Sequence, residues 1–386
     1  MASVVEKLIN QVSENSIDIG QLRELILNAI QIKDNLFIRG APGIGKSEVV
    51  RQVASEINQI MMNKLPRDQW FKDKKGNDCC FELIEIRLAL YDPSDISGIP
   101  SFVQDEYGVT RSKFSLPMEF PTNPKWKGII FLDEMDQAQP AVLNACYKMI
   151  QEKMINDWHF PEETTFIAAG NGNFCEGYQN EIPMALKNRF TNVVVEGNLD
   201  KWIVWALKND IEQSVISFLK SQHPEYYIDI DAMNRGEDSF ATPRGWEMVS
   251  KILKSKASDD IKKIHINGRI GFTVGTAFWS YYKKKRNLPN FQDILDGIID
   301  INDNSLDIFY SSIIGCIATI IRETDSETRK SYISNLSKSL NKLTKNENVV
   351  FATKLIYSMC KISDTDNPDF LKLIERTNNA YSKINR

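Results

Sequence analysis

The feature that most constrains the fold is a glycine-rich loop between an apolar run, residues 35–39, and an amphipathic helical stretch that follows it. The loop has the pattern G-x-x-x-x-G-K-[ST] and consists of Gly40, Ala41, Pro42, Gly43, Ile44, Gly45, Lys46 and Ser47. Its glycines allow backbone N–H groups to surround phosphate oxygens, and the helix adds the positive end of its dipole. This strand and helix context disfavours the alternative, a chance match in a glycine-bearing turn.

Each part of this loop suits the outer phosphates of a nucleotide. Lys46 can reach those phosphates, and the Ser47 hydroxyl can ligate Mg²⁺. Glu48 stands in the first turn of the helix, and we include it among the nucleotide-binding residues. The loop therefore predicts a site for a nucleoside triphosphate with magnesium.

A second signal is a pair of carboxylates, Asp133 and Glu134, at the end of the apolar run 128–132. Charges at the end of a buried strand are costly unless they are paired, so these two need a cation. We expect Asp133 to hold Mg²⁺ together with Ser47, and Glu134 to polarise the attacking water as a general base. The alternative is an acidic cap for the helix that follows, since Asp and Glu favour first turns.

A third signal is Asn171, which follows the apolar run 165–169 and Gly170. A neutral amide at this place can orient water against the terminal phosphate. Asparagine is also common in turns with positive φ, so a turn residue without a catalytic role is an equal alternative.

The pattern of residues 1–197 predicts an α/β fold, because short apolar runs alternate with amphipathic helical stretches. Strands are expected at residues 35–39, 81–86, 128–132, 165–169 and 192–195. We expect a parallel sheet between two layers of helices. Ligands of such sheets bind at the carboxyl ends of the strands, which is where the three signals lie.

Three domains are predicted. Residues 1–197 form the αβα nucleotide-binding domain, residues 198–302 a helical lid and residues 303–386 a C-terminal helical extension. The boundary at 198 is set by the end of the β-like runs, after which helical periodicity takes over. Helices are expected around 306–322, 325–343 and 348–362 in the last part.

Composition excludes several classes of protein. The chain is 42% apolar and 25% charged, an ordinary globular mixture. Its net charge of −4 gives no overall positive field for a nucleic acid. The six cysteines have no metal-site spacing, and the first 15 residues lack the apolar stretch of an export signal, so we expect a cytoplasmic protein. The longest apolar run, 313–321, is too short to cross a membrane.

Five segments occur in the order found in AAA+ ATPases, and in detail they resemble the MoxR family, of the dynein-related AAA type. They are APGIGKS, FLDEMDQAQPAVLNACYKMIQE, FIAAGNGN, IPMALKNRF and ATPRGWEMVSKIL. The resemblance covers about residues 20–255. It implies an AAA+ core with an all-α lid, ATP as the nucleotide, Mg²⁺ as the metal, and a homo-oligomer in the form of a hexameric ring.

The resemblance also implies roles for single residues. Asn171 matches sensor 1, Arg189 the arginine finger that acts on a neighbour's nucleotide, and Arg244 sensor 2. A planar, permanently charged guanidinium suits the charge of a transferring phosphoryl group. Alternatively, Arg189 caps its own helix and Arg244 is a surface residue at a helix start. The family has aspartate before the finger arginine, whereas this chain has Asn188, and nearby Lys187 is a second cationic candidate.

Two stretches are similar to the insertions of that family, residues 90–117 and 153–165, and both have the pattern of hairpins. In related motors such insertions face the pore or a partner. The candidates for such contacts are the aromatic residues Phe102, Tyr107, Trp158 and Phe160. Alternatively, these aromatic side chains hold the hairpins onto the domain.

We expect an ATP-hydrolysing motor that remodels or activates a protein partner. In MoxR-like systems this partner often carries a von Willebrand factor A domain, and neither a membrane nor a nucleic acid is expected as the main partner. The alternative is a nucleic-acid-associated AAA+ NTPase of the restriction or helicase type, which shares the fold and the chemistry. A scaffold that binds ATP without hydrolysing it is disfavoured by the pair Asp133 and Glu134.

Overall fold

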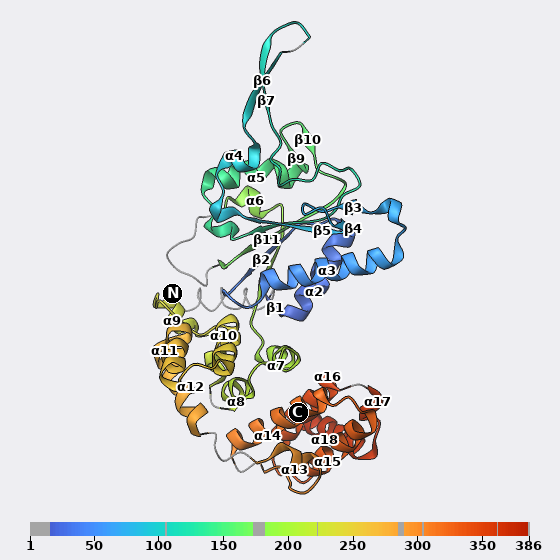
Figure 1. Cartoon of the computed structure of the whole chain (residues 1–386), viewed down its shortest axis with the longest axis vertical. Helices are drawn as coiled ribbons and strands as arrows, with labels where there is room; N and C mark the ends of the chain where they lie inside the picture. Colours follow the sequence, from blue (N-terminus) through green and yellow to red (C-terminus); the bar gives the residue numbers. More distant parts are fainter. Residues whose placement is uncertain are drawn as a thin grey trace. The chain divides into compact units, whose positions relative to one another are not determined.

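The computed structural model describes residues 16–104, 106–172, 182–221, 223–284, 289–302, 305–360 and 362–384. The N-terminal segment on which the cytoplasmic prediction depends lies outside them. The chain divides into two compact units, Met1–Gly197 and Asn198–Arg386 (Figure 1).

The first unit contains a six-stranded parallel sheet, which confirms the predicted fold class. In spatial order its strands are β1 (Ser16–Ile17), β12 (Thr191–Val195), β2 (Leu36–Gly40), β11 (Glu163–Gly170), β8 (Lys127–Asp133) and β5 (Glu82–Arg87). All five predicted strands are present within two residues of the expected bounds, whereas the two-residue strand β1 was not predicted. Because β11 pairs with both β2 and β8, the carboxyl ends of these three strands lie side by side.

Helices cover both faces of this sheet (Figure 1). Alternate side chains of the central strands, such as Ile130, Leu132 and Phe166, pack on one face against α5. The helices α2 and α3 lie on the other face (Figure 1). In the part of the unit that the structure describes, the helical elements are α2 (Ile19–Ile32), α3 (Lys46–Lys64), η1 (Arg67–Gln69), η2 (Leu88–Leu90), α4 (Pro93–Ser97), η3 (Met135–Gln137), α5 (Pro140–Glu152) and α6 (Met184–Lys187).

Within the described residues, three antiparallel hairpins are inserted between these elements. They are β3 (Phe71–Lys72) with β4 (Asp78–Cys79), β6 (Pro100–Gln104) with β7 (Thr110–Phe114), and β9 (Met154–Ile155) with β10 (Trp158–His159). The last two confirm the predicted hairpins. The β6–β7 hairpin projects from its unit, and both of its strands are exposed (Figure 1).

The aromatic candidates of the two predicted hairpins differ in exposure. Phe102 and Tyr107 are 81% and 80% exposed, and Trp158 is 36% exposed. Phe160 is only 6% exposed, and its ring packs edge-on against Phe120 at 5.3 Å and Phe166 at 5.4 Å. The interpretation of Phe160 as a partner contact is therefore wrong, because its ring is part of the core and holds the insertion in place.

The described residues of the second unit form helices and connecting turns, without strands. The helices are α7 (Leu199–Lys208), α8 (Gln213–Ser221), η5 (Pro224–Tyr227), α9 (Ile230–Asn234), α10 (Pro243–Lys254), α11 (Asp259–Ile270), α12 (Phe272–Lys284), α13 (Phe291–Leu295), α14 (Leu306–Arg322), α15 (Ser326–Asn341), α16 (Asn346–Met359), α17 (Ile362–Thr365) and α18 (Pro368–Ile384). The three helices predicted in this part correspond to α14, α15 and α16, and α18 was not predicted. One hydrophobic cluster extends from Trp202 to Leu373. The predicted domain boundary at residue 302 stays a prediction.

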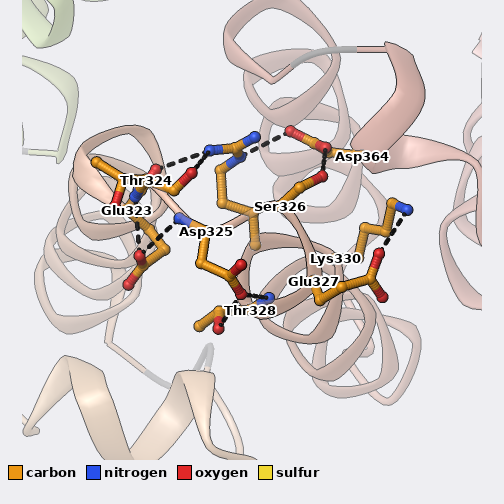
Figure 2. A network of polar contacts seen from close by, with 9 residues as sticks. Glu323, Thr324, Asp325, Ser326, Glu327, Thr328, Lys330 and Asp364 are labelled. Carbon is orange, nitrogen blue, oxygen red and sulfur yellow. Dashed lines mark hydrogen bonds and ion pairs between the residues drawn. The ribbon is translucent and has the colours of Figure 1, made fainter.

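A polar network fixes the turn between α14 and α15 (Figure 2). The Arg329 guanidinium donates to Asp364 Oδ2 at 2.8 Å and to the backbone carbonyls of Glu323 and Thr324 at 2.9 and 3.0 Å. The Ser326 hydroxyl donates to the other oxygen of Asp364 at 3.1 Å. The Asp364 side chain is 1% exposed, so the network attaches α17 to this turn through a buried ion pair.

We expect Asp364→Asn to lower the melting temperature by several degrees, because the variant leaves the Arg329 charge without its counter-ion in a buried place. The matched control is Glu327→Gln in the same turn. Glu327 pairs with Lys330, but its side chain is 83% exposed, so its loss should change the melting temperature little. Circular dichroism at rising temperature measures both, and equal melting curves for the two variants would contradict this assignment.

Candidate nucleotide site

The phosphate loop connects β2, which ends at Gly40, to α3, which begins at Lys46. Gly45 has a φ of 103°, a conformation that side chains disfavour. At Gly40 an added Cβ would lie 2.5 Å from the carbonyl oxygen of Val195 on β12. Glycine is thus required at position 45 by the backbone conformation of the turn, and at position 40 by the close approach of β12. Gly45 provides no side-chain cap for α3, so the helix N-terminus is free of side-chain competition for an anion.

Lys46 lies inside this loop and is 8% exposed. Its ammonium donates to the carbonyl oxygens of Gly40 at 2.6 Å and Ala41 at 3.0 Å, and to Asn171 Oδ1 at 3.2 Å. These acceptors satisfy a buried charge, as its desolvation requires. They also join the loop to the end of β11, so two of the predicted site residues, Lys46 and Asn171, are in direct contact.

Ser47 and Asp133, the two predicted metal ligands, are also in contact. The Ser47 hydroxyl donates to Asp133 Oδ2 at 3.0 Å, although the residues are 86 positions apart. Hydroxyl and carboxylate oxygens are the donors that Mg²⁺ prefers, and it binds such sites through few protein ligands together with phosphates. The chemistry of the donors present therefore fits a magnesium ion.

Glu134 has a left-handed backbone, with φ 56° and ψ 38°. Its N–H donates to Asp133 Oδ1 at 3.0 Å, and its carboxylate lies 3.9 Å from Arg87 Nε at the end of β5. Glu134 stands at the N-cap position of η3 but makes no side-chain cap bond, and α5 begins only at Pro140. This geometry disfavours the alternative of an acidic helix cap for Glu134.

Two residues near the acid pair were not predicted from the sequence. Asp136 lies in η3, is 4% exposed, and accepts hydrogen bonds through Oδ2 from the backbone N–H groups of Asn171 at 2.6 Å and Gly172 at 3.0 Å. Arg87 stands opposite Asp133 in the register of β5 and β8. The third acid of DEMD was a visible signal for Asp136, whereas Arg87 depends on strand register, which a single sequence does not show.

Arg189 lies between α6 and β12 and is half-buried. Its guanidinium donates to the Tyr147 hydroxyl at 3.1 Å and lies 5.6 Å from the centre of that ring. Tyr147 belongs to α5. The side chain therefore contacts an aromatic residue of the neighbouring helix rather than the last carbonyl groups of α6, where a helix cap would bind.

The remaining predicted residues lie at the margins of this site or in the other unit. The Glu48 carboxylate is exposed and accepts from Gln52 at 3.1 Å, one turn further along α3, so we expect its backbone N–H rather than its side chain to contribute. Arg244 belongs to the second unit, where it is exposed in the first turn of α10 behind the N-cap Thr242. Its assignment as sensor 2 stays a prediction.

An ion pair attaches α3 to the sheet. The Arg51 guanidinium donates from two nitrogens to the two carboxylate oxygens of Glu85 on β5, at 2.6 and 3.0 Å. These bonds raise the pKa of Arg51 above its usual value. A bidentate pair defines an orientation as well as a distance, so it helps to fix the helix that carries Lys46 and Ser47.

Two buried cysteines lie outside this site. Burial raises the pKa values of Cys146 and Cys316 to about 12, so both thiols stay protonated at neutral pH. Within the described ranges, no group of three histidine, cysteine or acidic side chains is arranged to hold a metal ion. No helix in those ranges is both long and apolar enough to cross a membrane.

The fold and the site define a P-loop nucleotide-binding domain, because a phosphate loop and an acid pair meet at the carboxyl edge of a parallel sheet. Residues 36–197 match the profile of the ATPase family associated with various cellular activities (AAA). These residues are an AAA ATPase domain, and the chain that carries them is an ATP-hydrolysing enzyme.

Solved structures of low similarity complete the comparison. A RuvB variant from Thermotoga maritima is 15% identical, with 74% of this chain and 78% of that chain covered and a TM-score of 0.36. NtrX from Brucella abortus in complex with ATP is 12% identical, with 98% of this chain and 71% of that chain covered and a TM-score of 0.35. The ORC2 protein from Aeropyrum pernix is 10% identical, with 95% of this chain and 94% of that chain covered and a TM-score of 0.37. A comparison with curated proteins found no match.

The left-handed backbone of Glu134 predicts a difference between two variants that both lack the carboxylate. A Cβ in this conformation costs about 1–2 kcal/mol, so Glu134→Gly should unfold with a free energy about 1 kcal/mol higher than Glu134→Ala. Urea denaturation of the two variants measures the difference. The control is exposed Asn144 within α5, where Gly should instead be about 1 kcal/mol less stable than Ala. The same sign at both positions would contradict the assigned conformation.

Proposed function

We propose that this protein is a MoxR-like AAA+ motor that uses ATP hydrolysis to remodel or activate a protein partner. The observation that carries the proposal is the hydrogen bond of 3.0 Å between Ser47 and Asp133, with Glu134 beside it. It brings the phosphate loop and the acid pair into one site. The order of the five motifs in the sequence supports the MoxR assignment within the AAA class.

The phosphate loop binds the nucleotide in this proposal. Its backbone N–H groups and the N-terminus of α3 surround the phosphates, and Lys46 places a positive charge among them. Ser47 and Asp133 would hold the magnesium ion. When bound, this ion neutralises charge on the outer phosphates.

Glu134 is the general base, and Asn171 orients the attacking water. The Glu134 carboxylate accepts a proton from water as the water attacks the terminal phosphorus and the bond to the leaving phosphate breaks. The side-chain amide of Asn171 can hold that water, because its Oδ1 contacts Lys46 within the phosphate loop. Arg87 lies 3.9 Å from Glu134 and supplies a nearby cation that helps to hold the carboxylate at the end of β8.

Arg189 acts in our proposal on the nucleotide of a neighbouring subunit. A guanidinium is suited to the transition-state charge of phosphoryl transfer, and Tyr147 holds this one in a defined place. Action in trans requires an assembly in which each subunit faces the next, and we propose a hexameric ring. Arg244 is proposed as the sensor that reports the nucleotide to the helical unit.

The partner is proposed to be a protein, and specifically one with a von Willebrand factor A domain. The net charge of −4 favours a protein partner over a bare nucleic acid, because a negatively charged chain has no overall attraction for a polyanion. The exposed rings of Phe102 and Tyr107 on the projecting hairpin are candidates for its contact surface. No observation on the described residues favours the alternative, a nucleic-acid motor.

The variant Glu134→Gln tests the function and captures the partner in one experiment. We expect it to bind ATP as the parent does but to hydrolyse it at least about a hundredfold more slowly, since it loses only the proton acceptor. Held in the ATP state, it should retain its partner when purified from its native cells. The readouts are ATP turnover, ATP affinity and mass spectrometry of the captured proteins.

Lys46→Ala is the control, because it should neither bind ATP nor capture the partner. Parental turnover in Glu134→Gln would show that the general base is assigned wrongly. Capture of DNA, or turnover that DNA stimulates with a steep salt dependence, would replace the protein partner by a nucleic acid.

Mixed assemblies test whether Arg189 acts between subunits. Arg189→Ala should hydrolyse ATP about a thousandfold more slowly than the parent, as expected for loss of an arginine finger. Adding inactive Lys46→Ala subunits should restore turnover, because they supply Arg189 to the intact pockets of their neighbours. Mass photometry checks that mixed assemblies form. If they form and turnover stays low, action in trans is wrong.

A further inference from the structure

We propose that Asp136 is a positioning residue, which ties the turn of the proposed general base to the loop of the proposed water-orienting amide. The inference rests on the proposed function, since it assumes that Glu134 and Asn171 act on the same water. It adds a residue to which the proposed mechanism gives no role. Asp136 does not contact the nucleotide in this proposal but acts through Asn171.

Asp136 is placed by its chain neighbours beside the general base. It lies in η3, two residues after Glu134, so a displacement of one moves the other. Its side chain is 4% exposed, and Oδ2 accepts from the backbone N–H groups of Asn171 at 2.6 Å and Gly172 at 3.0 Å. One carboxylate oxygen thus anchors two consecutive peptide groups of the loop that follows β11. Charge-assisted hydrogen bonds of this kind are about twice as strong as neutral ones.

Glycine at position 170 makes this close approach possible. An added Cβ there would lie 2.8 Å from Asp136 Cγ and 2.9 and 3.0 Å from its two oxygens. The carboxylate therefore packs directly on the backbone at the end of β11. Among the described residues, its other oxygen, Oδ1, is buried without a hydrogen-bond partner. A buried carboxylate that holds two backbone N–H groups of one loop is well placed to position that loop.

The anchored loop in turn contacts the phosphate loop. Asn171 receives a backbone anchor from Asp136 at 2.6 Å, and its side-chain oxygen accepts from Lys46 Nζ at 3.2 Å. Three segments are therefore joined in series: the turn of Glu134, the loop after β11 and the phosphate loop. Through this connection Asp136 fixes the distance between the carboxylate that takes the proton and the amide that holds the water. A misplacement of about 1 Å can reduce turnover on the order of a hundredfold.

A double-mutant cycle with Asp136→Ala and Asn171→Ala tests the inference. We expect Asp136→Ala to lower kcat on the order of ten- to a hundredfold and to leave the Kd of ATP unchanged, because the phosphate loop is intact. In the Asn171→Ala background the same change should lower kcat little further, since its target is already lost. A merely structural role would lower kcat by the same factor in both backgrounds, and that result would overturn the inference.

Two more variants keep the test decisive if Asp136→Ala folds poorly. Asp136→Asn retains an oxygen that can accept from both N–H groups, so it should recover most of the turnover. Gly170→Ala retains the Asp136 side chain but displaces its carboxylate, so it should lower kcat as Asp136→Ala does. Parental turnover in Gly170→Ala, or none of this recovery in Asp136→Asn, would count against positioning.

The outcomes also separate this inference from the proposed function. Suppose that Asp136→Ala lowers kcat by the same factor in the parent and in Asn171→Ala, and that Glu134→Gln is inactive as expected. This result would contradict the positioning role of Asp136 and leave the proposed function intact. Parental turnover in Glu134→Gln would remove the proposed general base and this inference together. Parental turnover in Asn171→Ala would remove the proposed water-orienting amide, and with it the inference.

Discussion

The parallel pairing of β2, β11 and β8 is the constraint on which the site depends. Arg39 at the end of β2 lies opposite Gly170 of β11, and Ala168 of β11 lies opposite Leu132 of β8. The three strands therefore end at nearly the same level of the sheet. Because of this alignment the loop after β2 and the acids after β8 meet, and Ser47 can donate to Asp133 at 3.0 Å.

The site concentrates charge in a partly buried place, and each charged group is held by specific partners. Lys46 is surrounded by carbonyl and amide oxygens, Asp133 accepts from a hydroxyl and a backbone N–H, and Asp136 accepts from two backbone N–H groups. Fixed dipoles of this kind need little reorganisation when charge moves during a reaction. The same arrangement that satisfies the buried groups is therefore also suited to the phosphoryl transfer that we propose.

The two hairpin insertions show what could be predicted from the sequence and what could not. Both insertions were predicted as hairpins, on their similarity to the insertions of the MoxR family. Which aromatic residues are exposed could not be predicted, since Phe102 and Phe160 both belong to predicted hairpin insertions and yet have opposite burial. The contacts of Phe160 with Phe120 and Phe166 join segments that are distant in the chain. Local sequence does not encode such packing in a form that can be read directly.

The sequence by itself determined the phosphate loop, the acid pair, the five main strands and the α/β class, because each is written in a short segment with its own periodicity or motif. Tertiary structure alone decided which side chains meet: Arg87 with Glu134, Asp136 with the loop of Asn171, and Arg189 with Tyr147. These pairs depend on strand register and on the packing of helices against the sheet. Both are set by interactions among residues far apart in the chain, which no local pattern contains.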